Sequence, residues 1–331
     1  MATGDASVPF PALATGFGTG DAITQIHVEG RRRSDAPQSV EASDHWHIGS
    51  VGKSITALML TRLVEAGKLA FDDPITAHMD AGPDWADVTL RQVLAHRGRL
   101  PANPPIRNFI WPPKETNARQ RLVDEVLAKP PRAAKFRYSN LGYMLIGRVI
   151  EEVTGGSWEA AAQKLVLEPM ELTSAGFGAP PLPGPQGHRR RLFRTAKPVD
   201  PTGGKGDNPS FLAPAGGIYM SVEDFARYGQ TLLRLLTGRD GIVSAAAYAD
   251  ATRPLTEPSG LAYGGGLIEQ ADPDSGTDLR WHNGSNTMWM AHLTLAPKRD
   301  RFAVACTNIG GGAADLRLAK VTREFVSDDG N

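Results

Sequence analysis

The sequence His47-Ile48-Gly49-Ser50-Val51-Gly52-Lys53-Ser54 leads into a helical segment of the 331-residue chain, and its chemistry decides which fold the chain has. It allows two interpretations. In the first, Ser50 is a nucleophile and Lys53 is its base. In the second, Gly52, Lys53 and Ser54 end a phosphate-binding loop of the pattern Gly-x-x-x-x-Gly-Lys-Ser/Thr. Because the two interpretations belong to unrelated protein classes, residues elsewhere in the chain must distinguish them.

The phosphate-loop interpretation is weakened at position 47. The pattern needs glycine there, because a tight turn lets backbone N–H groups wrap the phosphates. His47 instead has a β-carbon that would crowd this turn. A downstream strand that ends in an aspartate for magnesium is also not apparent. This alternative predicts magnesium-dependent affinity for ATP.

The nucleophile interpretation rests on the spacing of Ser50 and Lys53. Residues three apart lie one helical turn apart, so both side chains project from the same helix face. A serine hydroxyl is a weak nucleophile at neutral pH, and a neutral lysine amine within hydrogen-bond reach can take its proton. The start of the helix also brings free N–H groups near the developing oxyanion. Ser-x-x-Lys is common on helix surfaces, however, so the motif needs partners elsewhere.

Two later segments supply candidate partners. Tyr138-Ser139-Asn140 lies where an extended segment meets a helix start, which suits a phenol held toward a cleft. Trp281-His282-Asn283-Gly284-Ser285 lies between two predicted strands. Taken alone, each has a simpler explanation: a helix cap beside a packing aromatic, and a polar turn with a satisfied histidine.

The three motifs in this order resemble those of the serine β-lactamase and penicillin-binding protein superfamily, specifically its class C and esterase-like branch. The similarity covers most of the chain. It also includes Gly67–Ile75, Val88–His96, Phe136–Tyr143 and Ala215-Gly216-Gly217. The resemblance implies a β-lactamase/transpeptidase-like fold with its active site in a cleft between two domains.

The resemblance also implies a role for each motif residue. Ser50 would attack a carbonyl carbon to form an acyl-enzyme, with Lys53 and Tyr138 sharing the general-base and general-acid steps. The sequence leaves open which of these two is the ground-state base. Asn140 would bind substrate or fix Lys53. The backbone N–H groups of Ser50 and Ser285 would form the oxyanion hole.

Position 282 bears on the substrate class. Antibiotic-hydrolysing relatives carry lysine there, a permanent cation suited to the carboxylate of a penicillin or peptide. His282 is mostly neutral at pH 7, and Asn283 replaces the hydroxyl residue usual in β-lactamases. Gly284 leaves room for substrate to lie along the strand. These substrate-binding residues favour neutral esters, although some peptidases of the superfamily also have histidine here.

Residues 104–113 are rich in proline and apolar side chains and are typical of a rigid loop. We hypothesise that Phe109 or Trp111 in this loop lines an acyl or alcohol pocket. Packing of the loop against its own domain explains the two residues equally well.

The order of predicted elements indicates an α/β (α+β) fold. Residues 21–29 and 44–48 are interpreted as an antiparallel strand pair, and a helix is expected from about Ser50 to Glu65. The middle of the chain is mostly helical. The final third predicts strands over 261–269, 279–283, 288–296 and 301–307, and then a helix over 313–326.

Strands at both chain ends with helices between them predict an antiparallel sheet flanked by helices. We expect residues 1–75 and 200–331 to form this sheet domain. Residues 76–199 would form an inserted, mostly helical domain, with the active site in the cleft between the two domains.

The amino-acid composition limits the classes of function that the chain can have. Hydrophobic residues make up 41% and charged residues 22%, as in ordinary globular enzymes. Lys+Arg and Asp+Glu each total 36, so no net field favours nucleic acid or a membrane. The single cysteine, Cys306, excludes an internal disulfide. Residues 1–20 lack the features of a secretory signal. A cytoplasmic location is therefore expected, or a periplasmic one if a signal peptide was removed.

The leading hypothesis is a serine esterase that needs no metal or cofactor and cleaves small neutral carboxylic esters. One alternative keeps the machinery and changes the substrate, giving a D-aminopeptidase, an amidase or a weak β-lactamase. Another is a penicillin-binding-type sensor that acylates slowly. The expected partner is a small ester or amide, and the oligomeric state is not predicted.

Overall fold

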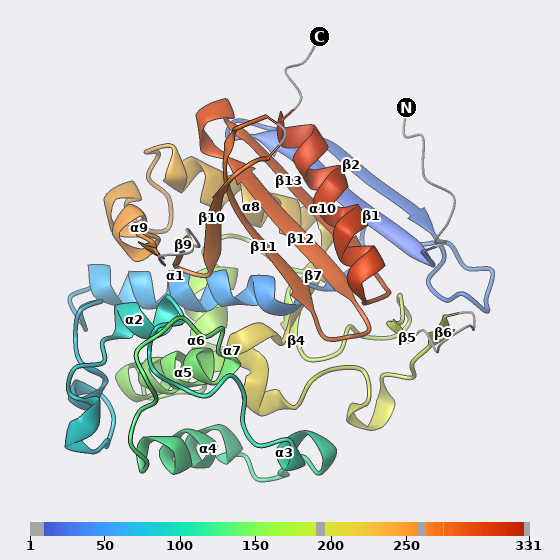
Figure 1. Cartoon of the computed structure of the whole chain (residues 1–331). Coiled ribbons are helices and arrows are strands. Elements are labelled where there is room, and N and C mark those ends of the chain that lie inside the picture. Colours follow the sequence, from blue (N-terminus) through green and yellow to red (C-terminus); the bar gives the residue numbers. More distant parts are fainter. Residues whose placement is uncertain (1–9, 190–195, 257–261, 274, 328–331) are drawn as a thin grey trace.

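The computed structural model describes residues 10–189, 196–256, 262–273 and 275–327. A large antiparallel sheet forms one side of the molecule, and most helices gather on the other (Figure 1). The strand order of this sheet is β2-β1-β13-β12-β11-β10-β9-β8. The N-terminal and C-terminal strands are neighbours because β1 pairs with β13. The predicted α/β fold with an antiparallel sheet built from both chain ends is therefore confirmed.

The strands of the large sheet are β1 (Ala12–Thr19), β2 (Ile23–Gly30), β8 (Leu255–Thr256), β9 (Ala262–Gly264), β10 (Leu267–Ala271), β11 (Asp278–Ser285), β12 (Met290–Ala296) and β13 (Arg301–Thr307). Two smaller sheets contain β3 (His45–His47), β7 (Ile218–Ser221) and β4 (Gly176–Phe177), and β5 (His188–Arg189) and β6 (Lys197–Pro198). The last four predicted strands correspond to β9 with β10, and to β11, β12 and β13. Residue 261 of the first of them lies outside the described residues.

One predicted pairing is wrong. Residues 21–29 and 44–48 do not pair with each other, because β2 pairs with β1 and β3 pairs with β7. Strand β1 has no polar–apolar alternation to reveal it. It is rich in alanine, glycine and threonine, and all but its last residue are buried. A strand covered on both faces gives no signal of period two.

Helices cover both faces of this part of the sheet. A Cβ on Gly16 would lie 2.9 Å from the Cβ of Ala226, so glycine lets α8 (Val222–Leu236) pack closely on one face. The next residue, Phe17, points to the other face, since side chains alternate along a strand. There it stacks on Phe325 of α10 (Gly312–Ser327), with ring centroids 4.3 Å apart.

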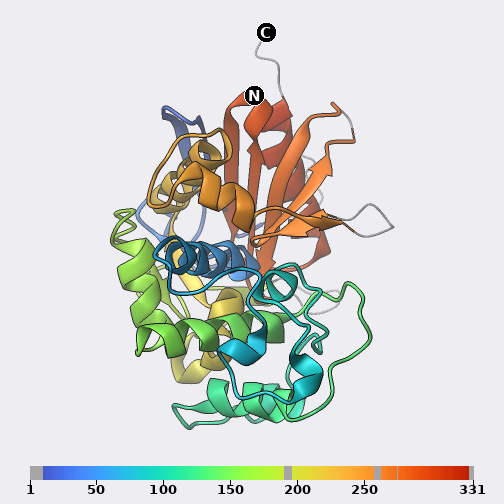
Figure 2. The same ribbon diagram turned by 90° about the vertical axis from the view of Figure 1, so that its left-hand side faces the viewer.

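Helix α1 (Gly52–Glu65) is the central element of the molecule. It lies between the large sheet and the helices of residues 90–162 in both Figure 1 and Figure 2. Most of its residues are buried on every side, and the fully enclosed residues include Leu58 and Lys53. A buried position requires a polar side chain to be hydrogen-bonded, which is the first indication that Lys53 has specific partners.

The other helices are α2 (Leu90–Leu94), α3 (Arg107–Ile110), α4 (Ala118–Leu127), α5 (Asn140–Thr154), α6 (Trp158–Ala162), α7 (Ala213–Gly216) and α9 (Ala245–Ala251). Short helical turns are η1 (Gly49–Val51), η2 (Ile75–Ala77), η3 (Pro83–Trp85), η4 (Gln163–Leu167), η5 (Thr202–Gly204), η6 (Ser210–Leu212) and η7 (Pro297–Arg299). In the part of the chain that the structure describes, no helix has both the length and the apolar character needed to cross a membrane.

Candidate active site

Ser50 lies in η1, the turn that connects the buried strand β3 to helix α1. Two glycines bring this turn against the end of β11. Gly49 has φ +53°, and a Cβ there would lie 2.4 Å from the Ser285 nitrogen. A Cβ on Gly284 would lie 1.9 Å from the Ile48 carbonyl oxygen and 2.7 Å from the Ser50 nitrogen. The backbones of the two segments are therefore in direct contact, and the nitrogens of Ser50 and Ser285 lie on facing segments.

Lys53 is fully buried, and its amine has three partners. Its Nζ lies 2.9 Å from Ser50 Oγ, 2.8 Å from Asn140 Oδ1 and 2.6 Å from the Ala215 carbonyl oxygen. Burial lowers the pKa of Lys53 well below its usual value. A neutral amine has two hydrogens and one lone pair. The two carbonyl-type oxygens can only accept, so donation to them leaves the lone pair for the Ser50 hydroxyl.

Tyr138 completes this group. Its phenol is hydrogen-bonded to Ser50, and its ring centroid lies 4.9 Å from Lys53 Nζ. The Tyr138 side chain is partly exposed. Burial raises the pKa of Tyr138 to about 12, although the hydrogen bond with Ser50 opposes this shift. The phenol is therefore protonated at neutral pH and can donate a proton.

The start of α5 holds Tyr138 and Asn140 in place. The Ser139 hydroxyl accepts the Gly142 N–H at 2.9 Å and so caps the helix. Asn140 accepts from Lys53, and its Nδ2 donates to Asn103 Oδ1 at 2.8 Å. The segment thus combines a helix cap with two side chains that reach the Ser50 group. The simpler explanation of this motif accounts for Ser139 alone.

His282 lies near this group, but both of its ring nitrogens are occupied. Nδ1 contacts the Asn283 carbonyl oxygen, and Nε2 lies 3.1 Å from the Tyr263 hydroxyl. Burial, together with the nearby Lys53, lowers the pKa of His282 to about 3. The ring is therefore neutral, with Nδ1 donating and Nε2 accepting. It packs 6.1 Å from the Tyr138 ring, between centroids, and offers no free nitrogen to a substrate.

The Asn283 side chain points away from Ser50. Its Nδ2 donates to Asp315 Oδ1 at 2.8 Å, and the same oxygen lies 2.7 Å from His292 Nε2. Asp315 belongs to α10, which packs on the large sheet. Neighbouring strand residues face opposite sides, so a buried His282 on the active-site side directs Asn283 to the other. The bond to Asp315 does not favour a contact between the Asn283 side chain and substrate, and that expectation stays a prediction.

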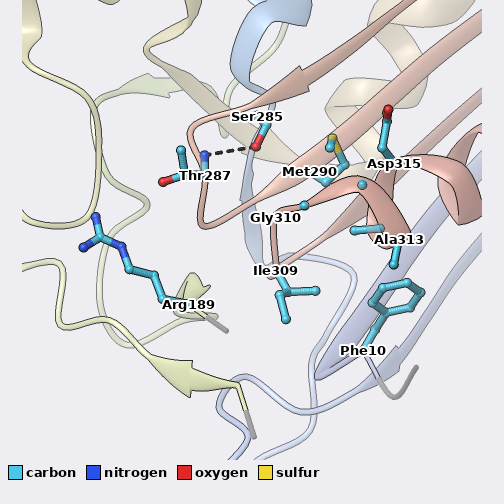
Figure 3. A pocket seen from close by; sticks show the side chains of 12 residues that line it. Phe10, Arg189, Ser285, Thr287, Met290, Ile309, Gly310, Ala313 and Asp315 are labelled. Carbon is cyan, nitrogen blue, oxygen red and sulfur yellow. Dashed lines mark hydrogen bonds between the residues drawn. The ribbon is translucent and has the colours of Figure 1, made fainter. Parts of the chain in front are cut away.

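Ser285 ends β11 at the edge of a cavity of about 680 Å³ (Figure 3). Its hydroxyl accepts the Thr287 N–H at 3.0 Å and donates to the Trp289 carbonyl at 2.7 Å. The Ser285 side chain thus closes the turn that follows it. Met290 and the start of α10 at Gly312 also line this cavity.

The two expected pocket residues differ in position. Phe109 lines a cavity of about 820 Å³, whose wall includes Ala213 and Gly217. Gly216 lies between these two residues, and a Cβ there would be 3.0 Å from the Ser50 nitrogen. This wall therefore adjoins the turn that contains Ser50. Trp111 is 74% exposed and does not line the cavity.

Several residues of the site were not predicted from the sequence. His96 accepts the Ser139 N–H at Nδ1, 3.1 Å away, and its ring lies 4.3 Å from that of Tyr138. Tyr263 bonds to His282. The usable signal was the run of three glycines after Tyr263, because a Cβ on Gly266 would lie 2.5 Å from the Ser54 nitrogen. Such a glycine marks a strand that approaches α1 closely.

The structure has an antiparallel sheet packed against a buried helix, and this helix presents a bonded Ser-x-x-Lys pair. This is the architecture of the serine β-lactamase and penicillin-binding protein superfamily. Residues 11–326 match the Beta-lactamase family, and the chain belongs to this family. It is 22% identical over 308 residues to Protein flp of Staphylococcus aureus (strain N315), across 88% of this chain and 59% of that protein. The chain spans about half to three-fifths of the length of the curated relatives it matches.

Solved structures show the same fold. The D-amino acid amidase from Ochrobactrum anthropi SV3, complexed with L-phenylalanine, aligns with a TM-score of 0.76 and 21% identity, over 96% of this chain and 92% of that one. A class C beta lactamase from Rhodobacter sphaeroides aligns with a TM-score of 0.75 and 18% identity, over 94% and 93%. The predicted superfamily is therefore confirmed. At these identities, the structures establish the fold alone.

Proposed function

We propose that this protein is a serine hydrolase that cleaves small neutral carboxylic esters through an acyl-enzyme on Ser50. The observation that carries the proposal is the contact of 2.9 Å between Ser50 Oγ and the amine of a fully buried Lys53. A neutral amine at this distance is a general base in place for the serine hydroxyl.

In the proposed reaction, Lys53 accepts the Ser50 proton while Oγ attacks the ester carbonyl carbon. The carbonyl oxygen becomes negative, and the N–H groups of Ser50 and Ser285 stabilise it. As the C–O bond to the alcohol breaks, Tyr138 protonates the leaving oxygen and regains a proton from Lys53. Water then attacks the acyl carbon, its proton passes through the same groups to Ser50 Oγ, and the bond from Oγ to the acyl carbon breaks to release the carboxylic acid. The lowered pKa of Lys53 and the raised pKa of Tyr138 support Lys53 as the ground-state base.

The electrostatics of the site support a neutral substrate. A substrate carboxylate needs a cation or hydrogen-bond donors once water is removed from it. His282 is neutral, and both of its nitrogens are already bonded. The Asn283 amide is bonded to Asp315 on another element. Neither of these two positions therefore supplies a charge or a free side-chain donor to an anionic substrate.

The cavity beside Phe109 supports an apolar subsite for the acyl or alcohol group. Its wall combines apolar residues from the 104–113 loop, from β4 and from the segments that follow β4 with charged residues that include Lys114, Lys205 and Asp207. Its apolar residues include Phe109, Pro112, Pro113, Phe177, Val199, Pro209 and Leu212. We propose that Phe109, rather than the exposed Trp111, contacts this part of the substrate.

A fluorophosphonate probe tests the proposal. Mass spectrometry should find one phosphonyl adduct on Ser50, and the Ser50→Ala variant should lose both the adduct and esterase activity. Labelling at another residue, or an active Ser50→Ala variant, would refute the mechanism. Turnover of a short-chain nitrophenyl ester, a D-aminoacyl amide and a chromogenic cephalosporin then distinguishes an esterase from an amidase or a β-lactamase. A slowly acylating sensor would form the acyl-enzyme on Ser50 without turnover of these substrates.

A further inference from the structure

We propose that Asp207 is a positioning residue that holds the two halves of the oxyanion hole together. The inference rests on the proposed function, because it concerns the N–H groups of Ser50 and Ser285. Asp207 lies in the segment before η6, far from both in sequence, and its side chain is only 8% exposed. A single oxygen of its carboxylate contacts both segments that carry these N–H groups.

The first contact leads to Ser50. His47 Nε2 lies 2.8 Å from Asp207 Oδ1, and the imidazole is completely buried. The two atoms are close, but their contact does not have the geometry of a hydrogen bond. The other ring nitrogen, Nδ1, accepts the Gly49 N–H at 3.1 Å. Nδ1 can accept only when it is unprotonated, so the ring proton resides on Nε2, facing the carboxylate. The Nε2 side of the ring thus lies against the Asp207 carboxylate, while Nδ1 holds the Ile48–Gly49 peptide, which is next to the peptide that carries the Ser50 N–H.

The second contact leads to Ser285. Asn286 Nδ2 donates to the same Asp207 oxygen at 3.0 Å. The Asn286 Oδ1 accepts the N–H groups of Met288 and Trp289, at 3.2 Å each. The side chain that follows Ser285 is therefore held between the carboxylate and the turn, which limits how far the end of β11 can move.

The charge of Asp207 is maintained by its surroundings. Burial opposes ionisation, but the adjacent His47 and the hydrogen bonds from Asn286 and the Asn208 N–H outweigh it and lower the pKa of Asp207. The Asn208 N–H donates to the same Oδ1 at 2.7 Å. The carboxylate oxygen is thus a fixed point between two backbone segments, each anchored to it through one side chain.

This arrangement matters for catalysis because an oxyanion hole is sensitive to geometry. Both donors must lie about 2.7–3.1 Å from the position of the transition-state oxygen. The Ser50 and Ser285 nitrogens belong to separate elements, a turn before α1 and the end of β11. Direct packing at Gly49 and Gly284 keeps the two segments from approaching further. The link through Asp207 keeps them from separating.

Three variants test the inference with a nitrophenyl ester as substrate. Asp207→Ala removes the shared oxygen and should lower kcat roughly 10- to 100-fold, while KM changes less than about 3-fold. Asp207→Asn retains an oxygen at Oδ1 and should recover most of kcat. Asp224→Ala is the matched control. Asp224 is a buried carboxylate that accepts the Ser174 N–H at 2.8 Å, and neither segment of the oxyanion hole is among its partners in the described structure.

A second measurement, the affinity for a boronic acid, distinguishes an effect on the oxyanion hole from a general loss of protein stability. Phenylboronic acid adds to a serine Oγ and forms a tetrahedral adduct with an oxygen in the oxyanion hole. Its affinity should fall in Asp207→Ala by about the same factor as kcat, and should be unchanged in Asp224→Ala. If Asp207→Ala does not fold, Asn286→Ala removes the link from Asp207 to the turn after Ser285, together with the Asn286 bonds to Met288 and Trp289, leaves the His47 contact in place, and should lower both quantities.

The outcomes distinguish this inference from the proposed function. Folded Asp207→Ala and Asn286→Ala variants that keep the kcat and boronate affinity of the unaltered protein would overturn the inference, even if Ser50 is labelled by fluorophosphonate. Failure of that labelling in the unaltered protein would refute the proposed function, and the inference with it. Equal losses of kcat in Asp207→Ala and Asp224→Ala would show a general effect of instability and also overturn it.

Discussion

Substitution of Gly284 by alanine is the sharpest perturbation of the proposed oxyanion hole. The added Cβ would lie 1.9 Å from the Ile48 carbonyl oxygen and 2.7 Å from the Ser50 nitrogen. Both are backbone atoms, so no side chain can rotate away. Protein atoms without a bond between them do not approach so closely, and the end of β11 must move from the Ser50 turn by about 1 Å.

The expected loss follows from this displacement. Misplacement of a reacting group by about 1 Å can cost about 100-fold in rate. Removal of one oxyanion donor costs about 100- to 1,000-fold in kcat, equivalent to roughly 3–4 kcal/mol. We therefore expect kcat for a nitrophenyl ester to fall by about 100-fold or more. Overpacking should also lower the free energy of unfolding by about 1–3 kcal/mol.

The assay combines steady-state kinetics with thermal or urea unfolding. Gly82→Ala is a matched control, because Gly82 has an extended backbone and a Cβ there would meet no atom within 4 Å. The control should keep kcat and have equal or slightly higher stability. A folded Gly284→Ala protein with kcat within about 3-fold of the unaltered enzyme would refute the close contact between β11 and the Ser50 turn.

Two further predictions concern the base and the substrate pocket. Lys53→Met should abolish ester turnover. Because burial lowers the pKa of Lys53, the unfolded chain binds a proton that the folded chain lacks. The unaltered protein should therefore gain stability relative to Lys53→Met as the pH rises from 7 to 9. Melting curves that stay parallel over this range would contradict a neutral Lys53. Phe109→Ala should change the relative turnover of esters with different acyl chain lengths by roughly 3- to 10-fold. Trp111 is exposed, so Trp111→Ala should leave this relative turnover unchanged. Equal effects of the two substitutions would contradict the assignment of Phe109 to the substrate pocket.

The sequence predicts the local part of the site well because that part follows from helix geometry. Ser50 and Lys53 are three residues apart, and one helical turn places them together whatever the rest of the fold does. Tyr138 and Asn140 lie at the start of another helix, and the structure brings both to the Ser50–Lys53 pair. Their prediction depended on family resemblance, because no spacing rule relates residues almost ninety positions apart.

The remainder depends on packing that the local pattern does not encode. Strand β1 escaped prediction because burial on both faces removes alternation. The Ala215 carbonyl contributes a backbone atom, and any residue type has one. The roles that we propose for Asp207 and Asn286 arise only when three distant segments meet. The direction of the Asn283 side chain, in contrast, could have been predicted from the sequence. If His282 faces the site, the alternation of side chains along a strand directs Asn283 to the opposite face.

The charges of the site explain why backbone geometry should dominate its catalysis. Burial lowers the pKa of Lys53 well below its usual value, Tyr138 is protonated, and His282 is neutral with both nitrogens occupied. A penicillin-type carboxylate would thus lose its water without gaining a cation from position 282, whereas a neutral ester has no such charge to desolvate. The one negative charge that the reaction creates is the oxyanion itself. Its proposed stabilisation comes from two N–H groups on separate elements, so the contacts that fix their separation, at Gly284 and through Asp207, should control kcat more strongly than substrate affinity.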